Sequence, residues 1–356
     1  MSVKLLAKNI IRKLLIARRK SIFLNNQHNP HELSKAQLRR AKRLGFTPEE
    51  YAVYNLNVND PSEYISEFER SVYRDMVKEQ RVILDNKVVF YNIIRNFADV
   101  NTIWAYKKSG KYVMLEDGYE INSILARLRE NGRIVYKKQT AGGGKGFKLL
   151  EYGQGQYYIN RVTCDEKDIV DLLETDDYLL EAYCVQSTFE DELCPYSVNT
   201  LRIITLSKEN ECKAIYAIQR MGATQDSVVD NAYMGGLYAR IDVLSGQMSS
   251  ARSRGKGKLF DENGGIIEFD THPVTGVMIK GRVIPDWDSI VKQVEVLHEK
   301  LRFTGLDLIA WDIALTEKGI NVIEANTSCA MGLLQNYEGM RKKEVGQWMK
   351  ERGCLK

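Results

Sequence analysis

The sequence has no run of about 18 consecutive apolar residues, so we expect no membrane-spanning helix. Lys8, Arg12 and Lys13 interrupt the N-terminal Leu and Ile residues, which argues against a signal peptide. The 6 cysteines form no Cys-x-x-Cys pair and there are only 4 histidines, so little is available for a zinc site. This cysteine usage is typical of free thiols in a reducing compartment, and we expect a cytoplasmic protein.

Proline is also scarce, at 6 of 356 residues, whereas 44% of the residues are hydrophobic and 28% are charged. This composition argues against a disordered chain. The length is typical of a globular protein of two or three domains.

Acidic residues are nearly absent from residues 1–45, which contain twelve Lys or Arg residues and one acid, Glu32. Aliphatic residues recur there at helical spacing, and they predict a basic amphipathic arm: Val3, Leu6, Ile10 and Leu14. Such a helix can contact an anionic membrane surface, bind nucleic acid, or pack on the body with its charges in water. We favour packing on the body, and we expect no nucleic acid because aromatic residues are missing among these charges until Phe23.

The remaining sequence predicts a helical region followed by short strands. Helices are expected after Pro48, over residues 61–80, 86–97 and 120–130, and later at Asp165–Glu174, Asp286–Lys300 and Asn336–Arg352. Strands are expected at Thr102–Tyr106, Lys111–Leu115, Arg133–Gln139, Phe147–Tyr152, Gln156–Cys164, Asp177–Gln186, Ser197–Ser207, Glu211–Gln219, Gly236–Val243, Leu306–Leu315 and Gly319–Glu324. Adjacent strands joined by short loops predict an α+β fold with mainly antiparallel sheets.

A glycine-rich segment, Ala141–Gly146, lies between two predicted strands. Its glycines allow backbone N–H groups to turn towards a phosphate: Gly142, Gly143, Gly144 and Gly146. Lys145 adds a positive charge, but the segment is neither a Walker A loop nor a dinucleotide-binding motif. On its own, the segment is equally compatible with a glycine-rich hairpin that binds nothing.

The strand before this loop favours a ligand. Lys137 and Lys138 end the apolar run Ile134–Tyr136, so one of the two lysines must project from the sheet face that the loop covers. A lysine in that position is suited to the α- or β-phosphate of a nucleotide.

Three oxygen-bearing side chains lie in the last predicted hairpin. Asp312 lies in an apolar stretch, where an unpaired carboxylate is unfavourable. Glu324 and Asn326 are two residues apart on a strand and therefore share a face. Carboxylate and amide oxygens are the ligands that Mg²⁺ prefers beside nucleotide phosphates. A hairpin whose acids pair with nearby Lys or Arg is the alternative, but the lysine strand and glycine loop upstream favour a metal site.

Two strands between these motifs carry further candidates. The strand Tyr178–Cys184 meets Glu181 and then leaves its apolar pattern, and such an edge can offer backbone groups to an adenine ring, although many strands end in Glu. Arg202 lies among the β-branched residues of 197–205. A buried Arg requires an anion, and a structural carboxylate and a phosphate are equally compatible with the pattern.

The order of these motifs resembles the ATP-grasp superfamily, and more narrowly its sugar-transfer-associated branch. The branch-level resemblance rests on short motifs spread over roughly residues 45–350: Ser197–Arg202, Gly235-Gly236, His272–Gly276, Ile284-Pro285 with Trp287, and Trp311-Asp312 leading to Glu324–Asn326. The resemblance implies that ATP lies between two α+β subdomains. It also implies a carboxylate that attacks the γ-phosphate, giving an acylphosphate that an amine or thiol captures.

The resemblance further implies roles for individual residues. Lys137 would contact the α/β-phosphates, and the loop 142–146 would close over them. Glu181 and the backbone of Tyr183 and Cys184 would hold adenine. Asp312, Glu324 and Asn326 would ligate one or two Mg²⁺ ions.

One position departs from the related D-alanine–D-alanine ligases, which have an Arg two residues before the metal Asp. Here that place is taken by Ala310, so Arg202, or less favourably Arg240, would have to stabilise the transferring phosphate. His272 is a candidate base, but a His beside Pro273 in a turn is as often structural. The acceptor side of the site therefore stays open.

We expect four parts: a basic arm (1–45), a helical region (46–115), a small ATP-grasp subdomain (116–186) and a large subdomain with the metal site (187–356). The expected activity is ATP- and Mg²⁺-dependent ligation of a carboxylate to an amine or thiol. The resemblance alone links this activity to surface polysaccharide or sugar-conjugate biosynthesis. The alternatives are a small-molecule kinase and a non-catalytic nucleotide-binding partner of a glycosyltransferase, which the basic arm would place at the inner membrane surface.

Overall fold

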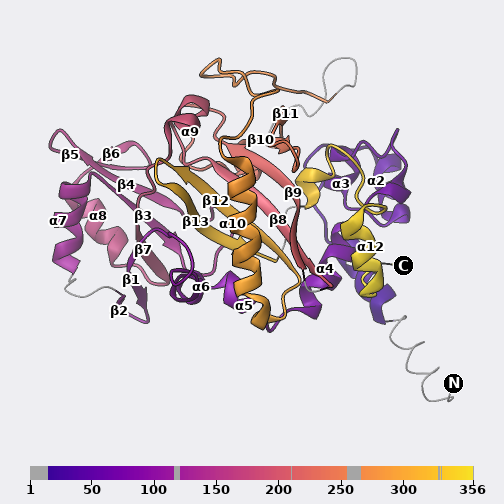
Figure 1. The fold of residues 1–356 in the computed structure, drawn as a ribbon, viewed down its shortest axis with the longest axis horizontal. Helices are drawn as coiled ribbons and strands as arrows, with labels where there is room; N and C mark the ends of the chain where they lie inside the picture. Colours follow the sequence, from indigo (N-terminus) through magenta and orange to yellow (C-terminus); the bar gives the residue numbers. More distant parts are fainter. Residues whose placement is uncertain are drawn as a thin grey trace. The chain divides into compact units, whose positions relative to one another are not determined.

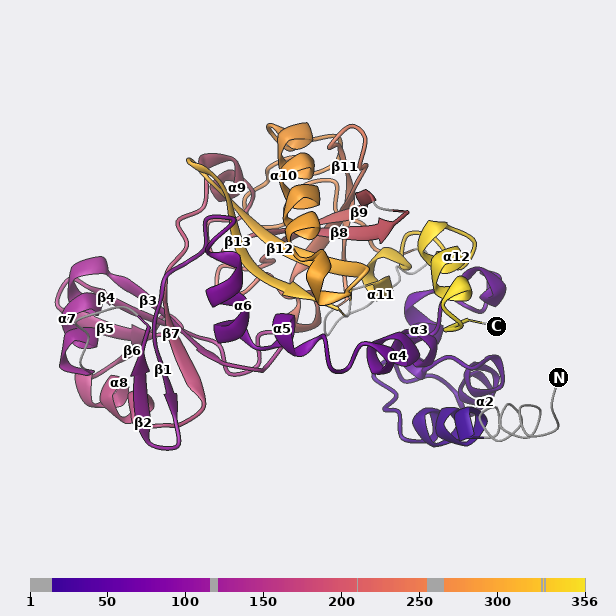
Figure 2. The ribbon, with the colours of Figure 1, turned by 60° about the horizontal axis from the view of Figure 1, so that its bottom comes forward.

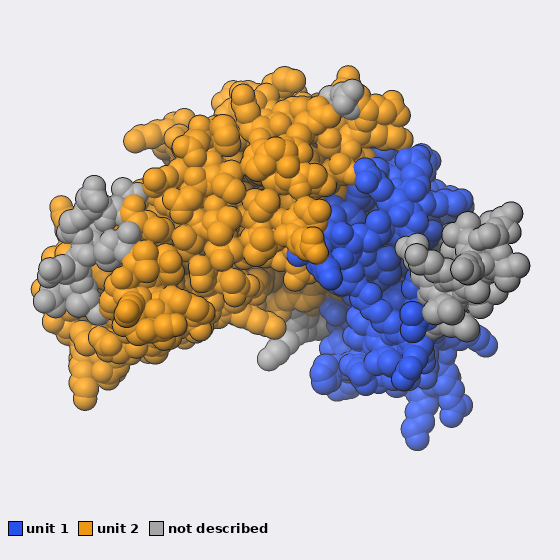
Figure 3. All heavy atoms as spheres, turned by 90° about the horizontal axis from the view of Figure 1, so that it is seen from below, with its two compact units in different colours: residues 1–78, 330–356 blue, residues 79–329 orange. Residues whose placement is uncertain are grey.

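The computed structural model describes residues 15–115, 121–209, 211–254, 266–327, 329 and 331–355. The chain divides into two compact units, residues 1–78 with 330–356 and residues 79–329, which Figure 3 colours separately. The four-part division expected from the sequence is finer and stays a prediction. The helix predicted over residues 3–16 falls almost entirely outside the described residues.

The unit formed by both ends of the chain is helical where it is described. Its short turn Pro61–Glu63 follows Asp60, but the α-helix expected over 61–80 begins only after Ser66, which forms a capping box with Glu69. The C-terminal helix expected from residue 336 also begins later. The α-helices of this unit are α2 (Lys35–Leu44), α3 (Pro48–Val53), α4 (Glu67–Met76), α11 (Met331–Leu334) and α12 (Glu344–Glu351).

Aromatic contacts hold the two ends of the chain together in this unit. The Tyr73 ring meets Trp348 edge-on, with 5.1 Å between the ring centroids. Residues 15–25 are helical, and Phe23 packs on Phe68 with 5.8 Å between centroids. Arg19 of the same stretch pairs with Asp75. The helical stretch 15–25 of the basic arm therefore packs on α4.

The other unit contains two antiparallel sheets (Figures 1 and 2). In the described residues the first sheet has the strand order β2-β1-β7-β3-β4-β5-β6 and the second has the order β11-β10-β9-β8-β12-β13. The strands of the first sheet are β1 (Ile103–Lys108), β2 (Lys111–Met114), β3 (Arg133–Lys138), β4 (Lys148–Gly153), β5 (Gln156–Ile159), β6 (Val162–Cys164) and β7 (Tyr178–Ala182). Those of the second are β8 (Thr200–Lys208), β9 (Glu211–Met221), β10 (Leu237–Ile241), β11 (Met248–Ser253), β12 (Leu308–Thr316) and β13 (Gly319–Asn326).

One strand prediction was wrong and one strand was missed. The single strand expected over Gln156–Cys164 is the hairpin β5–β6, because Asn160 and Arg161 both take positive φ values, 51° and 68°. Two successive left-handed residues make the tight turn that favours a hairpin. The strand β11 was not expected; it pairs antiparallel with β10, with a register shift between Ala239 and Ile241.

Helices pack on both sheets. Side chains of α7 (Ile121–Asn131) and α8 (Glu166–Leu173) form a buried core with one face of the first sheet. The helix α10 (Trp287–Lys300) packs on β8 and β9 of the second sheet (Figure 1). Between the sheets lies α6 (Lys87–Ile94), which follows α5 (Val82–Asp85) and touches β1 and β13 (Figure 2). Val88 and Tyr91 of α6 form a buried cluster with Ile103 and Leu179 of the first sheet.

A buried carboxyl group lies on the α10 side of the second sheet. Glu190 belongs to α9 (Thr188–Leu193) and is 0% exposed. Its Oε2 accepts a hydrogen bond of 2.9 Å from Gln219, and its Oε1 has no partner in the part of the chain that the structure describes. Burial raises the pKa of Glu190 to about 8. The folded protein therefore holds this group protonated at neutral pH.

Replacing Glu190 with Gln is expected to make the stability less dependent on pH. A carboxyl whose pKa is raised on folding destabilises the folded state increasingly as pH rises from its unfolded pKa towards about 8. Between about pH 5 and 8 the wild type should lose more free energy of unfolding than Glu190→Gln, by on the order of 3 kcal/mol. Urea unfolding of both proteins at both pH values measures this difference, and equal losses would contradict it.

Candidate active site

One face of the second sheet carries a row of charged side chains. Arg202 of β8 lies directly opposite Asp312 of β12, and Asp312 lies opposite Glu324 of β13. Directly opposed residues share a sheet face, so the three side chains form one row. Asn326 follows Glu324 by two residues on the same face, and its amide donates to the Glu324 carboxylate at 3.2 Å. The structure thus brings together the three predicted metal ligands and Arg202.

The electrostatic centre of this row is Asp312, whose side chain is only 1% exposed. Arg202 donates from Nε to Oδ1 at 2.6 Å and from Nη2 to Oδ2 at 2.5 Å, and Arg220 Nη2 lies 3.1 Å from Oδ2. Although burial opposes ionisation, these two guanidinium groups lower the pKa of Asp312 to about 2. Asp312 is therefore an anion throughout the neutral pH range.

Arg220 and Asp230 were not predicted from the sequence. Arg220 donates to the Thr200 hydroxyl at 2.9 and 2.6 Å and pairs with Asp230 at 3.3 Å. The expected strand ended at Gln219, but β9 runs to Met221. A predicted strand two residues longer would have included Arg220. Arg220 lies opposite Thr200, and Thr200 precedes Arg202 by two residues, so Arg220 and Arg202 share a sheet face.

The first sheet carries a lysine, Lys137, whose side chain is mostly buried. Lys137 forms an ion pair with Glu181, and the two side chains are 11% and 6% exposed. Asn101 donates to the same carboxylate at 3.0 Å. Lys138 projects from the other face and donates to the Asp176 carbonyl at 3.0 Å. Of the two lysines that the sequence left open, Lys137 lies beside the predicted adenine edge, whereas the Lys138 side chain packs against Gly146 of the glycine loop.

Lys87 links the two groups of residues, and the sequence analysis missed it. Its Nζ donates to the Ala141 carbonyl of the glycine loop at 2.7 Å and lies 3.6 Å from Glu324 Oε2. Lys87 is the first residue of α6, and the side chain of Asn86 caps that helix. The sequence placed the start of this helix at residue 86, but it did not show which strands lie on either side of the helix. One ammonium group thus reaches both the glycine loop and the acidic hairpin.

Three glycines of the glycine loop have a backbone conformation that other residues rarely adopt. Gly143, Gly144 and Gly146 have φ values of 69°, 74° and 75°, a left-handed backbone that other residues rarely adopt. A Cβ on Gly144 would come 3.0 Å from the Met234 sulfur, and one on Gly143 would come 3.6 Å from the Asn231 amide. The loop therefore lies against residues 229–236, next to Asp230.

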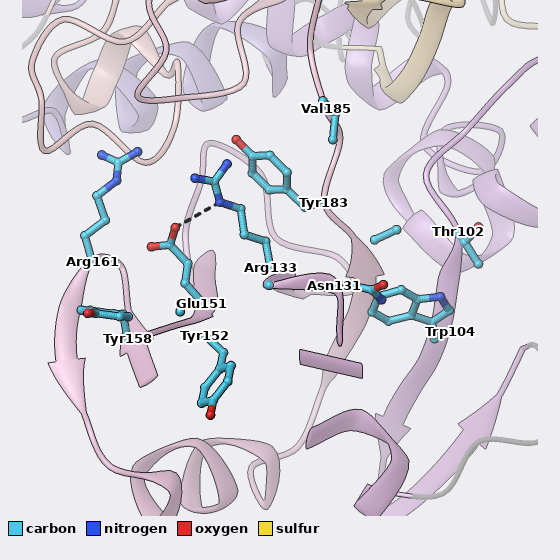
Figure 4. A pocket seen from close by; sticks show the side chains of 13 residues that line it. Thr102, Trp104, Asn131, Arg133, Glu151, Tyr152, Tyr158, Arg161, Tyr183 and Val185 are labelled. Atoms are coloured by element: carbon cyan, nitrogen blue, oxygen red, sulfur yellow. Dashed lines mark ion pairs between the residues drawn. The ribbon is translucent and has the colours of Figure 1, made fainter. Parts of the chain in front are cut away.

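A cavity of about 900 Å³ opens beside the predicted adenine edge (Figure 4). Ala182 and Tyr183, which follow Glu181 directly, line it. The Arg133 guanidinium lies 5.0 Å from the centre of the Tyr183 ring, and its Nε lies 3.2 Å from Glu151. The edge thus faces open space large enough for a ring system.

The other predicted residues differ in how they relate to this site. Arg240 lies opposite Ile218, which lies opposite Arg202, so Arg240 extends the charged row across the sheet. Lys145 is exposed in the glycine loop. Cys184 is buried, and burial raises the pKa of its thiol to about 12, so only its backbone is suited to ligand binding.

The contacts of His272 are typical of a structural residue, because both of its ring nitrogens bond to the backbone. Its side chain is buried, Nε2 contacts the Gly222 carbonyl at 2.7 Å, and Nδ1 accepts from the backbone N–H groups of Val274 and Thr275 at 3.3 Å. Because Nδ1 is an acceptor, Nε2 carries the proton and donates it to the carbonyl. Burial also lowers the pKa of the ring. This geometry leaves no nitrogen available to a substrate.

The acidic hairpin suits Mg²⁺ better than a metal that requires an all-protein cage. No cluster of three or more His, Cys, Asp or Glu side chains suitable for a metal occurs among the described residues. Mg²⁺ is usually held by one or two carboxylates together with phosphates, and Asp312 and Glu324 lie side by side on one sheet face. Their oxygens are of the type that Mg²⁺ prefers, but in this structure Arg202 and Arg220 contact Asp312 and Lys87 lies beside Glu324, which is the pairing that the sequence left open as the alternative.

Comparisons with known proteins give one family. The model of the sugar-transfer associated ATP-grasp family matches residues 66–347. None of the curated proteins matches the chain. In the described residues, no helix has both the length and the apolar character that crossing a membrane requires.

Three solved structures are similar to the chain. With carboxyaminoimidazole ribonucleotide synthase from Aspergillus clavatus, complexed with ATP, the identity is 13% and the TM-score 0.36, over 72% of this chain and 50% of that chain. The L-amino acid ligase from Bacillus licheniformis is 11% identical with a TM-score of 0.36, and the match covers 72% of this chain and 43% of that chain. D-alanyl-alanine synthetase A from Vibrio cholerae is 11% identical with a TM-score of 0.42, and the match covers 82% of this chain and 74% of that chain. The chain spans about half the length of the first two structures.

Proposed function

Because the chain belongs to the sugar-transfer associated ATP-grasp family, we propose that it is an enzyme that uses ATP and Mg²⁺ to ligate a carboxylate to an amine or thiol. The family match covers more than half of the chain and confirms the family and the fold predicted from the motifs. The activity is our proposal, and it rests on the site described above.

The observation that carries the proposal is the position of Lys87. Its ammonium group touches the Ala141 carbonyl at 2.7 Å and lies 3.6 Å from the Glu324 carboxylate. The glycine loop and the acidic hairpin therefore face the same space. A triphosphate held under the glycine loop would then lie near the Glu324 carboxylate.

Each residue then has a role set by its chemistry. Lys137 and Lys87 are cations suited to the α- and β-phosphates, and the loop 142–146 offers backbone N–H groups and Lys145. Glu181 and the backbone of residues 183 and 184 are suited to the adenine edge. Asp312 and Glu324, with Asn326, would hold Mg²⁺, which when bound would neutralise charge on the transferring phosphoryl group. Arg202, with Arg240 farther along the row, is the candidate to stabilise that group.

The proposed reaction has two transfers. A substrate carboxylate oxygen attacks the γ-phosphorus, and the bond to the β–γ bridging oxygen breaks to release ADP. An amine or thiol then attacks the acyl carbon, loses a proton, and displaces inorganic phosphate. Positioning and charge neutralisation supply most of the catalysis in phosphoryl transfer, and the site offers both. The association of the family with sugar transfer favours substrates of surface polysaccharide or sugar-conjugate biosynthesis.

Incubation with ATP, Mg²⁺ and pools of carboxylates and amines or thiols tests this proposal. ADP together with an amide or thioester product supports it. ADP together with a stable phosphorylated product would make the protein a kinase. Nucleotide binding without turnover over all pools would make it a non-catalytic binding protein.

We also propose that the helical unit contacts an anionic membrane surface. The helix α2 carries five basic residues and no acid, and none of these five side chains makes an ion pair or hydrogen bond with the described residues: Lys35, Arg39, Arg40, Lys42 and Arg43. Beside it, Leu15 and Ile22 are 60% and 52% exposed on one face of the helical stretch 15–25. Exposed aliphatic side chains among cations are typical of helices that lie on a bilayer surface.

Replacing Arg39 and Arg40 with Gln is expected to weaken binding to vesicles that contain phosphatidylglycerol. Each cation near an anionic surface contributes about 1 kcal/mol, so the pair should account for roughly a tenfold or larger loss. Co-sedimentation with vesicles measures this, and Lys292→Gln with Lys300→Gln on α10 is the charge-matched control. Equal binding by both variants, or binding to neutral phosphatidylcholine vesicles as well, would contradict the proposal.

A further inference from the structure

The turn of the β5–β6 hairpin carries an arginine where the backbone favours glycine. Asn160 and Arg161 have positive φ values of 51° and 68°, and the second position of such a turn is usually glycine, because a Cβ is unfavourable there. Asn160 is fixed on β4: its N–H donates to the Leu149 carbonyl at 2.8 Å, and its side chain accepts from the Leu149 N–H at 2.9 Å. An arginine that opposes the local preference indicates that its side chain is used elsewhere.

The Arg161 side chain extends from the first sheet to segments that flank the second. Its Nη1 donates to the Gln225 carbonyl at 2.6 Å and to the Ser227 carbonyl at 3.0 Å, and its Nη2 donates to the Tyr196 carbonyl. The guanidinium carbon lies 5.9 Å from the centre of the Tyr196 ring. Tyr196 precedes β8, and residues 225–227 follow β9. Three hydrogen bonds from one side chain therefore link the two layers.

The segment 222–227 that receives Arg161 is fixed on its other side. The Gly222 N–H donates to the Ser197 hydroxyl at 3.1 Å, and the Gly222 carbonyl contacts His272 Nε2 at 2.7 Å. A Cβ on Gly222 would come 2.7 Å from Ser197 Oγ and 2.8 Å from the Ser227 Cβ, so the segment is closely packed. Arg161 therefore contacts a part of the chain that the second layer holds in place.

The same link borders the cavity beside the predicted adenine edge. Arg161 lines that cavity (Figure 4). In the described residues the chain passes from the first sheet to the second once, between β7 and β8, and Tyr183 and Val185 of this passage line the cavity as well. The cavity is thus bordered both by the covalent connection between the sheets and by the Arg161 link.

The link also lies close in sequence to the contacts of the glycine loop. Ser227 is two residues before Val229, and a Cβ on Gly144 would come 3.7 Å from the Val229 side chain. Arg161 therefore holds the chain just before the segment against which the glycine loop lies.

We propose that Arg161 is a positioning residue that holds the two sheets together at the cavity and thereby slows the release of bound nucleotide. This inference rests on the proposed nucleotide-binding function. In this account the sheets separate when the nucleotide leaves, and the separation breaks the three hydrogen bonds of Arg161. Because Arg161 acts on the opening and not on the ligand, its loss changes mainly the rate of release.

Spin labels on the two layers test the link without any nucleotide. Lys167 of α8 and Leu244 of the β10–β11 turn are exposed and can be replaced with Cys for labelling, and Cys164→Ser removes the native cysteine that is not buried. Pulsed electron paramagnetic resonance should give one narrow distance distribution, which Arg161→Gly should broaden towards longer distances. Glycine also suits the left-handed backbone, so the hairpin itself should still form. Identical distributions with and without Arg161 would overturn the inference.

Release of the fluorescent nucleotide mant-ADP, chased with excess ADP in the presence of Mg²⁺, tests the consequence for binding. Arg161→Gln and Arg161→Gly should release mant-ADP about tenfold or more faster than the wild type, because charge-assisted hydrogen bonds that oppose the opening are lost. The rate of association should change little. A variant that is merely less stable would bind less nucleotide in total but release it at the wild-type rate.

Arg129→Gln is the matched control. Arg129 belongs to α7 of the same layer and pairs with Glu166 at the surface, where its side chain is 46% exposed, so this variant should release mant-ADP as the wild type does. Equal release rates for the wild type and the Arg161 variants would overturn the role of Arg161 while leaving the nucleotide site intact. Failure of the wild type to bind mant-ADP would overturn the proposed nucleotide site, and the spin-label distances would then decide the link by themselves.

Discussion

Replacing Asp312 with Asn is expected to reduce ATP turnover at least about a hundredfold. The substitution keeps the shape of the side chain but removes the charge that Mg²⁺ would use. It also leaves Arg202 and Arg220 with fewer anionic partners in a buried site, and breaking a buried ion pair costs on the order of 3–5 kcal/mol. ADP release in steady state, with thermal unfolding of the same samples, measures both effects.

Glu324→Gln separates the catalytic loss from the stability loss. Glu324 is less buried, at 24% exposure, and its Lys87 partner is 3.6 Å away, so the variant should lose turnover while its melting temperature stays close to that of the wild type. Glu317→Gln lies at the turn of the same hairpin, where the carboxylate binds Thr188, and should retain turnover. Near-wild-type turnover in both Asp312→Asn and Glu324→Gln would remove the metal assignment.

Replacing Lys137 with Met is expected to weaken ATP binding by about 10- to 100-fold. The ammonium group is buried beside Glu181, and its loss removes a desolvated cation from the proposed phosphate site while leaving Glu181 with Asn101 as its remaining partner. The fall in affinity should therefore exceed the fall in the turnover number at saturating ATP. Equilibrium titration and steady-state kinetics on the same variant give the two quantities.

An exposed lysine of the same sheet provides a control for this change. Lys108 of β1 pairs with Asp177 at the surface, so Lys108→Met should bind ATP as the wild type does. The double variant Lys137→Met with Glu181→Gln should regain the stability that the single variant loses, because no charge stays unpaired. Equal ATP affinities for the two single Met variants would contradict the role of Lys137.

Local patterns were enough to predict much of the fold and part of the site. Alternation along a strand placed Glu324 and Asn326 on one face, and an apolar run marked Asp312 as a buried acid that needs a partner. The partner itself, Arg202, is 110 residues away in sequence and was left open between a carboxylate and a phosphate. The structure provides the carboxylate, because β8 and β12 are neighbours in one sheet.

Features that depend on distant strands could not be predicted. Lys87 is defined by contacts to Ala141 and Glu324, and nothing near Lys87 in sequence indicates either contact. Arg220 was missed because the alternating pattern of β9 weakens near its end, where charged and polar residues replace apolar ones. The Asn160-Arg161 turn was missed for a different reason, since an Asn followed by Arg lacks the Gly that usually marks a two-residue hairpin.

A crystal structure of the protein with Mn²⁺ and AMP-PNP tests the central claim most directly, because Mn²⁺ replaces Mg²⁺ and its anomalous scattering marks the metal position. The account predicts a Mn²⁺ peak in contact with Asp312 and Glu324, and phosphates within hydrogen-bonding distance of Lys137 and Lys87. A nucleotide bound elsewhere on the protein, or a metal peak away from both carboxylates, would contradict it.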